Sequence, residues 1–265
     1  MIKLEHVVLA SPEQMEFIIE GTRNPMNSWN KSDSAICWRG IIDCPDNCYY
    51  KDKPAECQAD IIDEGSYVVG PNDLNLMKKL ANAGTDPRKF MRMMPVYVRI
   101  TAPLYWWKEF STYKVGTVAN SCSTMHKIQE KEFTMDDFST EHLYYVDQEM
   151  EDYIEDNKNN KRWACVNPMY LMNETIGTLN YYREMYLRTK DRKDWWQMIQ
   201  LLPSSYNQTR NVMMNYEVLA NIYKSRIDHK LDEWREFCKW IESLPYSELI
   251  CGPESLRKKL ILKED

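Results

Sequence analysis

Three polar residues near the C-terminal end of the chain have types and spacing that suit a long polar ligand. Asn215, Asn221 and Arg226 lie in a predicted helical stretch. At about 100° per residue, Asn215 and Arg226 share one face, and Asn221 sits roughly a third of a turn away. The span is about 16 Å along the axis, too long for one phosphate but suited to a dinucleotide or two neighbouring sites. The alternative is that these residues form an ordinary helix edge with a surface arginine. Spacing alone favours this alternative over a ligand site.

The stretch 101–127 joins a tight aromatic run to small polar residues, a pattern that a core helix does not need. It therefore indicates a binding surface. The alternative is an oligomer interface in which Trp106 and Trp107 are the anchors. The chain contains no Gly-x-Gly-x-x-Gly, P-loop, Gly-x-Ser-x-Gly or His-Glu-x-x-His motif, so the enzyme classes that rely on them gain no support.

Four of the eight cysteines cluster near the N-terminal end of the chain. Four thiolates can bind zinc tetrahedrally, but this cluster lacks the usual close Cys-x-x-Cys pairs. The spacing therefore favours free thiols in a loop-rich insertion over 32–70, with structural zinc as the alternative. The four candidate ligands are Cys37, Cys44, Cys48 and Cys57.

Composition bounds the class of protein. The 265 residues are 43% hydrophobic and 28% charged, as in a folded globular chain, and we expect one domain over 1–265. A net charge of −6 with dispersed basic residues argues against general nucleic-acid binding. No apolar run is long enough for a bilayer span, and the N-terminus does not resemble a secretion signal. We therefore expect a cytoplasmic protein with reduced cysteines and no membrane partner.

Local signals predict the elements that position these residues. Residues 2–10 alternate weakly and predict a strand. Ser11 is then the N-cap of a helix, with a proline at its first position and Gln14 completing a capping box. Residues 71–84 predict a short helix that Gly84 can close.

The rest of the chain predicts one more strand and several helices. Residues 95–103 alternate as a half-buried strand, and an aromatic helix follows over 104–114. An acidic helical segment covers 141–156, one long helix or two cover 168–203, and a further long helical stretch covers 208–244. The class is α+β with helix in excess.

The C-terminal residues resemble a motif of the flavin-dependent thymidylate synthases. In that family a long helix carries an Asn, a second Asn six residues later and an Arg five residues after that. A His-rich turn and a Trp follow. This chain has the same order, with the Trp one residue late, and Leu-Leu-Pro precedes it at the family's distance. The matching residues are Asn215, Asn221, Arg226, His229 and Trp234, with 201–203 upstream.

The stretch 101–127 resembles the same family less closely. Ala102 and Pro103 end a strand as in the family, and Asn120 and Ser123 match an Asn and a Ser if one residue is inserted. The departures are Thr112, Tyr113 and Lys114 in place of the hallmark Arg-His-Arg, Glu109 for Gln, and Met125 and Ile199 for two arginines. Lys114 keeps one positive charge but not the forked geometry of a guanidinium.

The resemblance implies both a fold and a chemistry. It implies a helix-rich α+β domain with a small antiparallel sheet, assembled as a homotetramer with its sites at subunit interfaces. Members of the family bind FAD and dUMP and transfer a methylene group from methylene-tetrahydrofolate to C5 of uracil. NADPH reduces the flavin, and no cysteine nucleophile is used.

Carried over residue by residue, the resemblance places Asn215, Asn221, Lys114 and Asn120 at the flavin, and Ser123, Arg226 and Glu109 at the nucleotide. It assigns no catalytic side chain. The lost arginines would have made charge-assisted hydrogen bonds to phosphate. The alternative to thymidylate synthesis is therefore a non-catalytic protein that senses or sequesters a nucleotide on the same scaffold.

Overall fold

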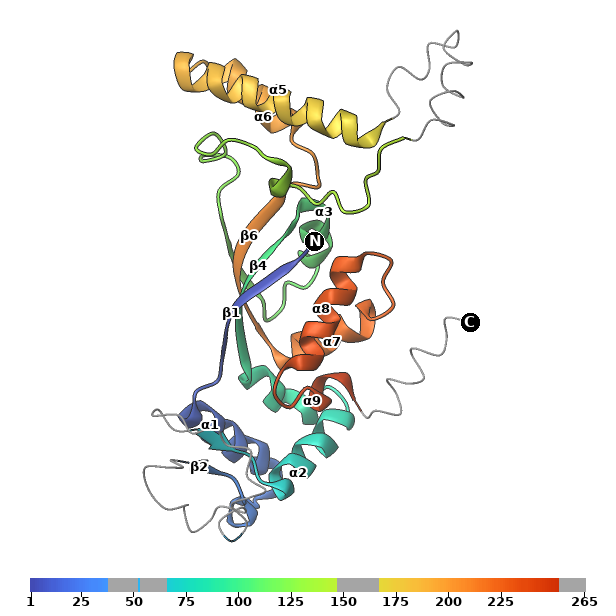
Figure 1. Cartoon of the computed structure of the whole chain (residues 1–265). Helices are drawn as coiled ribbons and strands as arrows, with labels where there is room; N and C mark the ends of the chain where they lie inside the picture. Colours follow the sequence, from blue (N-terminus) through green and yellow to red (C-terminus); the bar gives the residue numbers. More distant parts are fainter. Residues whose placement is uncertain (38–51, 53–65, 147–166, 253–265) are drawn as a thin grey trace. The chain divides into compact units, whose positions relative to one another are not determined.

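The computed structural model describes residues 1–37, 52, 66–146 and 167–252, whose helices and strands are drawn in Figure 1. The chain divides into two compact units. The first comprises Met1–Lys3, Thr101–Thr112 and Ser121–Arg210, and the second comprises Leu4–Ile100, Tyr113–Asn120 and Asn211–Asp265. No helix in the described part of the chain has the length and apolarity that a membrane crossing requires.

A small antiparallel sheet brings together strands from distant parts of the chain. Its order is β1 (Lys3–Leu9), β4 (Pro95–Pro103), β6 (Asn207–Asn215) and β5 (Val118–Ser121). The predicted alternation of β4 is confirmed, because Val96, Val98 and Ile100 are buried whereas Tyr97 and Arg99 are exposed. Such alternation is typical of an antiparallel strand with one face on the core.

The predicted helix over 208–244 is wrong in its first part. Asn207–Asn215 form β6, and α7 (Tyr216–Arg226) and α8 (Asp232–Ser243) follow as two separate helices. Val212 and Met214 of β6 are buried, which is the two-residue period of a strand. The segment contains three Asn residues, one Thr and one Val, which are weak helix formers, and pairing with β4 and β5 makes it a strand.

In the second unit, α1 (Pro12–Arg23) begins where the sequence predicts, and α2 (Pro71–Asn82) matches the helix predicted over 71–84 but ends two residues earlier. The Ser11 hydroxyl accepts a hydrogen bond from the Gln14 backbone N–H, and the Ser11 N–H donates to the Gln14 side chain at 2.9 Å. Gly84 follows α2 with φ of +114°, which favours glycine. Besides α7 and α8, the remaining helices in the described part of this unit are η1 (Asn24–Met26), η2 (Trp29–Lys31), η4 (Pro87–Met93) and α9 (Glu248–Cys251).

In the first unit, α3 (Leu104–Phe110) is shorter than the predicted helix over 104–114. The segment 168–203 forms two helices, α5 (Pro168–Thr189) and α6 (Arg192–Leu201), which pack on the loop carrying η5 (Met135–Asp137). Their shared core contains Ile128, Phe133, Phe138, Met172, Leu179 and Met198. Of the predicted acidic helix, residues 141–146 contain a turn and no helix, and the remainder lies outside the described residues.

The two ends of the cysteine-bearing insertion meet as a hairpin-like pair. β2 (Ala35–Cys37) pairs antiparallel with β3 (Ser66–Val68). Cys37 is buried there, whereas the other three candidate zinc ligands, Cys44, Cys48 and Cys57, lie outside the described residues. Within the described ranges, no group of three or more His, Cys, Asp or Glu side chains is arranged to hold a metal. The zinc hypothesis therefore stays a prediction.

A buried ion pair joins α1 to α2. Arg23 Nε donates to Asp73 Oδ1 at 2.5 Å, and the two side chains are 4% and 1% exposed. Asp73 also accepts hydrogen bonds from the Ser32 and Ser34 hydroxyls and the Asp33 backbone N–H. Burial alone would raise the pKa of Asp73, but these hydrogen bonds outweigh it and hold that pKa below its usual value.

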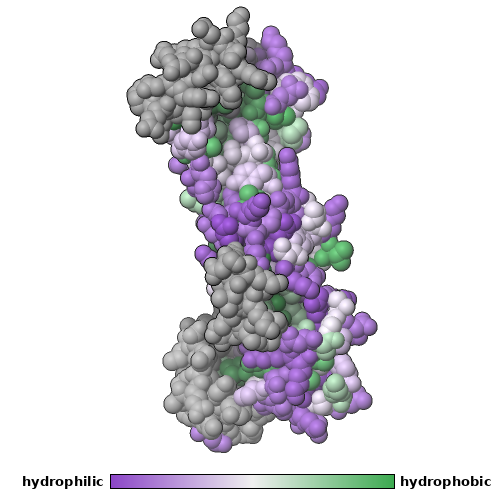
Figure 2. Space-filling model, turned by 90° about the vertical axis from the view of Figure 1, so that its right-hand side faces the viewer, coloured by the Kyte–Doolittle hydropathy of each residue, from purple (hydrophilic) through white to green (hydrophobic). Residues whose placement is uncertain are grey.

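On the face shown in Figure 2, hydrophilic residues cover most of the described surface, and hydrophobic residues form smaller patches between them. The largest fully buried side chains, by contrast, include Trp106, Trp107, Trp234 and Phe237. Three of the tryptophans are therefore core residues.

Candidate functional site

The turn from β6 into α7 is fixed by Asn215. This residue is the last of β6 and the N-cap of α7, and its Oδ1 accepts a hydrogen bond from the Val218 N–H at 3.0 Å. Asparagine suits this place because it satisfies one of the free N–H groups at a helix start. The prediction that Asn215 lies within a helix is therefore wrong. Leu219 and Ile222, which follow it in α7, are fully buried, so the apolar stripe is core.

Arg226 ends α7 in a cradle of aromatic rings. Its Nε donates to the Tyr113 hydroxyl at 2.9 Å, and its guanidinium carbon lies 4.8 Å from the centre of the Trp234 ring. Tyr113 and Trp234 meet edge to face at 6.0 Å, and His229 contacts Trp234 at 6.3 Å. A guanidinium over an aromatic face gains cation–π attraction, and the cradle holds its plane in one orientation. A guanidinium held in this way presents its N–H donors in the planar arrangement that binds a phosphate or a carboxylate.

The loop between α3 and β5 contacts α7 near both of its ends. Tyr113 reaches Arg226, as above, and Gly116 lies against the helix start. Gly116 has φ of +76°, and a Cβ there would come within 3.0 Å of Asn215 Nδ2 and 3.1 Å of a Val218 methyl. The close approach and the left-handed backbone both require glycine. The intervening Lys114 is exposed, and no described residue pairs with its ammonium group.

We expect Gly116→Ala to lower the free energy of unfolding by about 1–2 kcal/mol, because alanine is strained at positive φ. The added methyl group would also push against Asn215 and Val218. Urea denaturation followed by circular dichroism measures the change. The matched control is Gly177→Ala in α5, where nothing lies within 4 Å of the new Cβ and stability should rise by about 0.5–1 kcal/mol. Equal effects of the two substitutions would contradict the packing of this loop.

Asn221 belongs to a charged network on the exposed side of α7. Its Oδ1 accepts from Arg88 Nη2 at 3.0 Å, and Arg88 Nε lies 3.3 Å from Glu217 Oε1. Arg92 also donates to Glu217. The hydrogen bond from Arg92, followed by that from Arg88, lowers the pKa of Glu217 despite partial burial. The Asn221 amino group has no hydrogen-bond partner among the described residues, and the same holds for Asn215.

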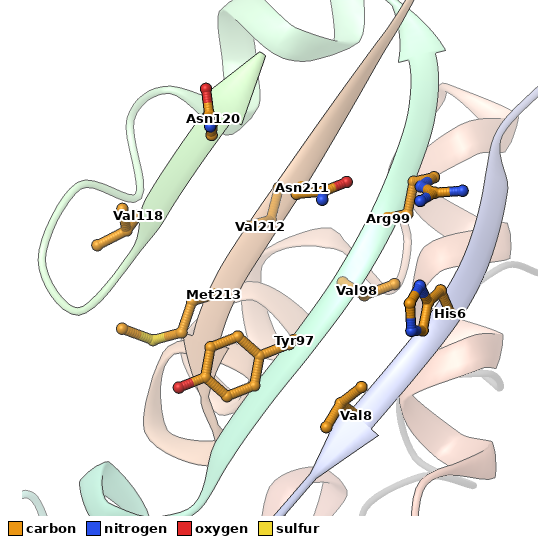
Figure 3. Close-up of a pocket in the computed structure, with 10 residues that line it drawn as sticks. All are labelled: His6, Val8, Tyr97, Val98, Arg99, Val118, Asn120, Asn211, Val212 and Met213. Atoms are coloured by element: carbon orange, nitrogen blue, oxygen red, sulfur yellow. The ribbon is translucent and has the colours of Figure 1, made fainter. Parts of the chain in front are cut away.

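A hollow of about 230 Å³ lies on the outward face of the sheet (Figure 3). All four strands line it, and the labelled side chains in Figure 3 include Asn120 of β5, the predicted flavin contact. Asn211 of β6 extends toward Arg99 of β4, and Tyr97 and Met213 add apolar surface. The sequence prediction missed Arg99 and Asn211. The outward positions of the alternating β4 pattern were the available signal for Arg99, whereas Asn211 lies in the segment that was predicted as helix.

His6 lines the same hollow with an unusual backbone. Its φ is +52° within β1, a left-handed conformation that is uncommon for residues other than glycine. A residue of this kind in a strand marks local strain. Nothing in the local sequence signals it.

The remaining predicted residues lie in the first unit. Ser123 is exposed, and its Oγ accepts from the His126 N–H at 2.9 Å. Glu109 is half-buried on α3. Of the residues at expected arginine positions, Met125 is 45% exposed and Ile199 packs on the core between α5 and α6. Asn215, Asn221, Lys114, Asn120 and Arg226 all lie in the second unit.

Solved structures provide the comparison. No family model matches the chain, and no curated protein matches it. The flavin-dependent thymidylate synthase ThyX from Helicobacter pylori, complexed with FAD and dUMP, is similar with a TM-score of 0.53 over 94% of this chain and 96% of that chain. A second structure of ThyX from Helicobacter pylori with FAD and dUMP has a TM-score of 0.54 and covers 97% and 98%. Both are 13% identical in sequence.

The chain has a ThyX-like fold. The expected helix-rich α+β class with a small antiparallel sheet is confirmed. The structural similarity covers nearly the whole of each chain and is therefore not confined to one element or motif.

Proposed function

We propose that this protein is a divergent ThyX-like binder of a pyrimidine nucleotide, with FAD as its cofactor. The observation that carries the proposal is the aromatic cradle of Arg226 at the end of α7. It presents an oriented cation on a fold shared with ThyX complexes of FAD and dUMP. A guanidinium that is already oriented loses little freedom when it binds phosphate.

Two asparagines, one at the start of α7 and one in its middle, fit a flavin edge. Asn215 and Asn221 each have an amino group without a described partner, while their oxygens are engaged within the protein. Amide N–H groups are donors, which flavin carbonyl oxygens accept. Lys114 would add a positive charge near an anionic ligand. In the family that this chain resembles, reduced FAD supplies a hydride and methylene-tetrahydrofolate supplies the one-carbon unit.

Thymidylate synthesis is the finer form of this proposal, with methylation of dUMP at C5 and NADPH as the reductant. The second candidate is a non-catalytic protein that senses or sequesters the nucleotide. Thr112, which stands where the family has an arginine, favours this second function. Its side chain carries no charge, and its hydroxyl donates to the Glu109 carbonyl at 2.8 Å. Fewer cations remain to stabilise a developing negative charge. By resemblance, we also propose a homotetramer.

Ligand-dependent melting tests the proposal. We expect FAD and dUMP together to raise the melting temperature of the protein, because a ligand that binds only the folded state stabilises it. The control ligand is deoxyuridine, which lacks the phosphate that Arg226 would bind. Equal melting temperatures with and without FAD and dUMP would contradict binding. Complementation of a thymidine-requiring strain then separates the two functions, since only an active synthase restores growth.

A further inference from the structure

A cavity of about 410 Å³ in the second unit lies beside α1, apart from α7 and the sheet-face hollow. Its volume falls in the range of small-ligand pockets. Glu16 and Glu20 of α1 contribute to its wall, together with the exposed rings of Phe17 and Trp29. Arg23 also lines it and is only 3% exposed. The cavity thus combines carboxylates, aromatic surface and one buried cation.

The buried cation has an unused donor. Arg23 gives its Nε to Asp73 and its Nη1 to Ser28, but its Nη2 is buried without a hydrogen-bond partner. A buried donor left without an acceptor destabilises the folded protein. An acceptor oxygen brought by a ligand would remove that cost. Because Asp73 already neutralises Arg23, a neutral carbonyl oxygen suffices.

The carboxylates on the cavity wall are exposed. Glu16 and Glu20 are one turn apart on α1, and no described residue pairs with either. Like charges at this spacing destabilise a helix. Glu13 adds a third negative charge to the same wall. With the Arg23–Asp73 pair neutral overall, these glutamates give the cavity a net negative charge, which attracts a cation.

We propose that this cavity binds an arginine or lysine residue of a peptide. The peptide carbonyl accepts from Arg23 Nη2, and the cationic side chain lies against Glu16 and Glu20. Phe17 and Trp29 cover the aliphatic part of that side chain, and their rings attract its charge. Tyr67 completes the wall. This inference does not depend on the nucleotide site.

The test is calorimetric titration with acetyl-Gly-Arg-Gly-amide at low ionic strength. The control peptide carries citrulline, which has nearly the shape of arginine without its charge. We expect the arginine peptide to bind at least 10-fold more tightly than the citrulline peptide. Equal affinity of the two peptides, or no binding of either, would overturn the proposal.

Two variants separate the cavity from general charge attraction. The triple variant Glu13→Gln, Glu16→Gln and Glu20→Gln should weaken arginine-peptide binding at least 10-fold. The matched control is the triple variant Glu132→Gln, Glu174→Gln and Glu184→Gln, which removes three exposed charges from the other unit and should change binding less than 2-fold. Equal losses in both would show non-specific attraction and reject the site. Phe17→Ala, at a 64% exposed position, should weaken binding at least 3-fold without changing the melting temperature.

Discussion

Replacing Asp73 by asparagine is expected to lower the free energy of unfolding by about 3–5 kcal/mol, the cost of removing one partner from a buried ion pair. The Asp73 side chain is 1% exposed and that of Arg23 is 4% exposed, so water cannot replace the lost charge. Arg23 would be left buried with a neutral partner. Because folded domains have about 5–15 kcal/mol of stability in total, urea denaturation resolves this loss readily.

Two further variants make the Asp73 prediction specific. Asp86→Asn removes an exposed carboxylate from the same unit and should change stability by less than about 0.5 kcal/mol. The double variant Arg23→Met with Asp73→Leu removes both charges together and should recover much of the loss. If Asp73→Asn and Asp86→Asn had the same effect, the buried pair would not hold α1 to α2.

The Asp73 effect should also depend on pH in a defined direction. The pKa of Asp73 is lowered in the folded protein, so its contribution to stability is complete above the unfolded pKa of about 3.9. That contribution is lost as pH falls through the lower folded pKa. The stability difference between wild type and Asp73→Asn should therefore be largest above about pH 5 and shrink at more acidic pH. A difference that grew on acidification would contradict the assigned direction.

Replacing Arg226 by alanine is expected to weaken dUMP binding in the presence of FAD by about 10- to 150-fold. A hydrogen bond to a charged group contributes about 1.5–3 kcal/mol, and this substitution removes the donor. Arg226→Lys should recover only part of the affinity, because an ammonium lacks the planar fork that Tyr113 and Trp234 orient. Calorimetric titration of dUMP measures all three proteins.

The control for Arg226 lies in the same helix. Lys224→Ala removes an equal charge from an exposed position of α7 and should change dUMP affinity less than 3-fold. Melting temperatures of both variants separate a binding defect from loss of the fold. If Arg226→Ala bound dUMP as tightly as the wild type, the guanidinium cradle would serve the core alone.

Local signals in the sequence predicted the features that depend on neighbouring residues. The capping box of Ser11 and Gln14 and the positive φ of Gly84 depend on a few adjacent residues, and both were expected. The alternation of β4 was also correctly predicted, since one face must meet the core.

Features made by contacts between distant residues were not predictable in the same way. Tyr113 and Arg226 are 113 positions apart, and Arg23 and Asp73 are 50 apart. Neither pair has a local sequence signal. β6 was mistaken for helix because its structure depends on pairing with strands that lie far away in sequence. Of the candidate site, the sequence named Asn215 and Arg226 but not the ring of Tyr113 as a partner.

The visible absorption spectrum of the purified protein, taken after incubation with FAD and exhaustive dialysis, tests the central claim most directly. We predict a retained flavin band that weakens when Asn215 and Asn221 are both replaced by alanine. A colourless wild-type protein, with the fold intact by circular dichroism, would contradict FAD binding and direct the search to a different nucleotide.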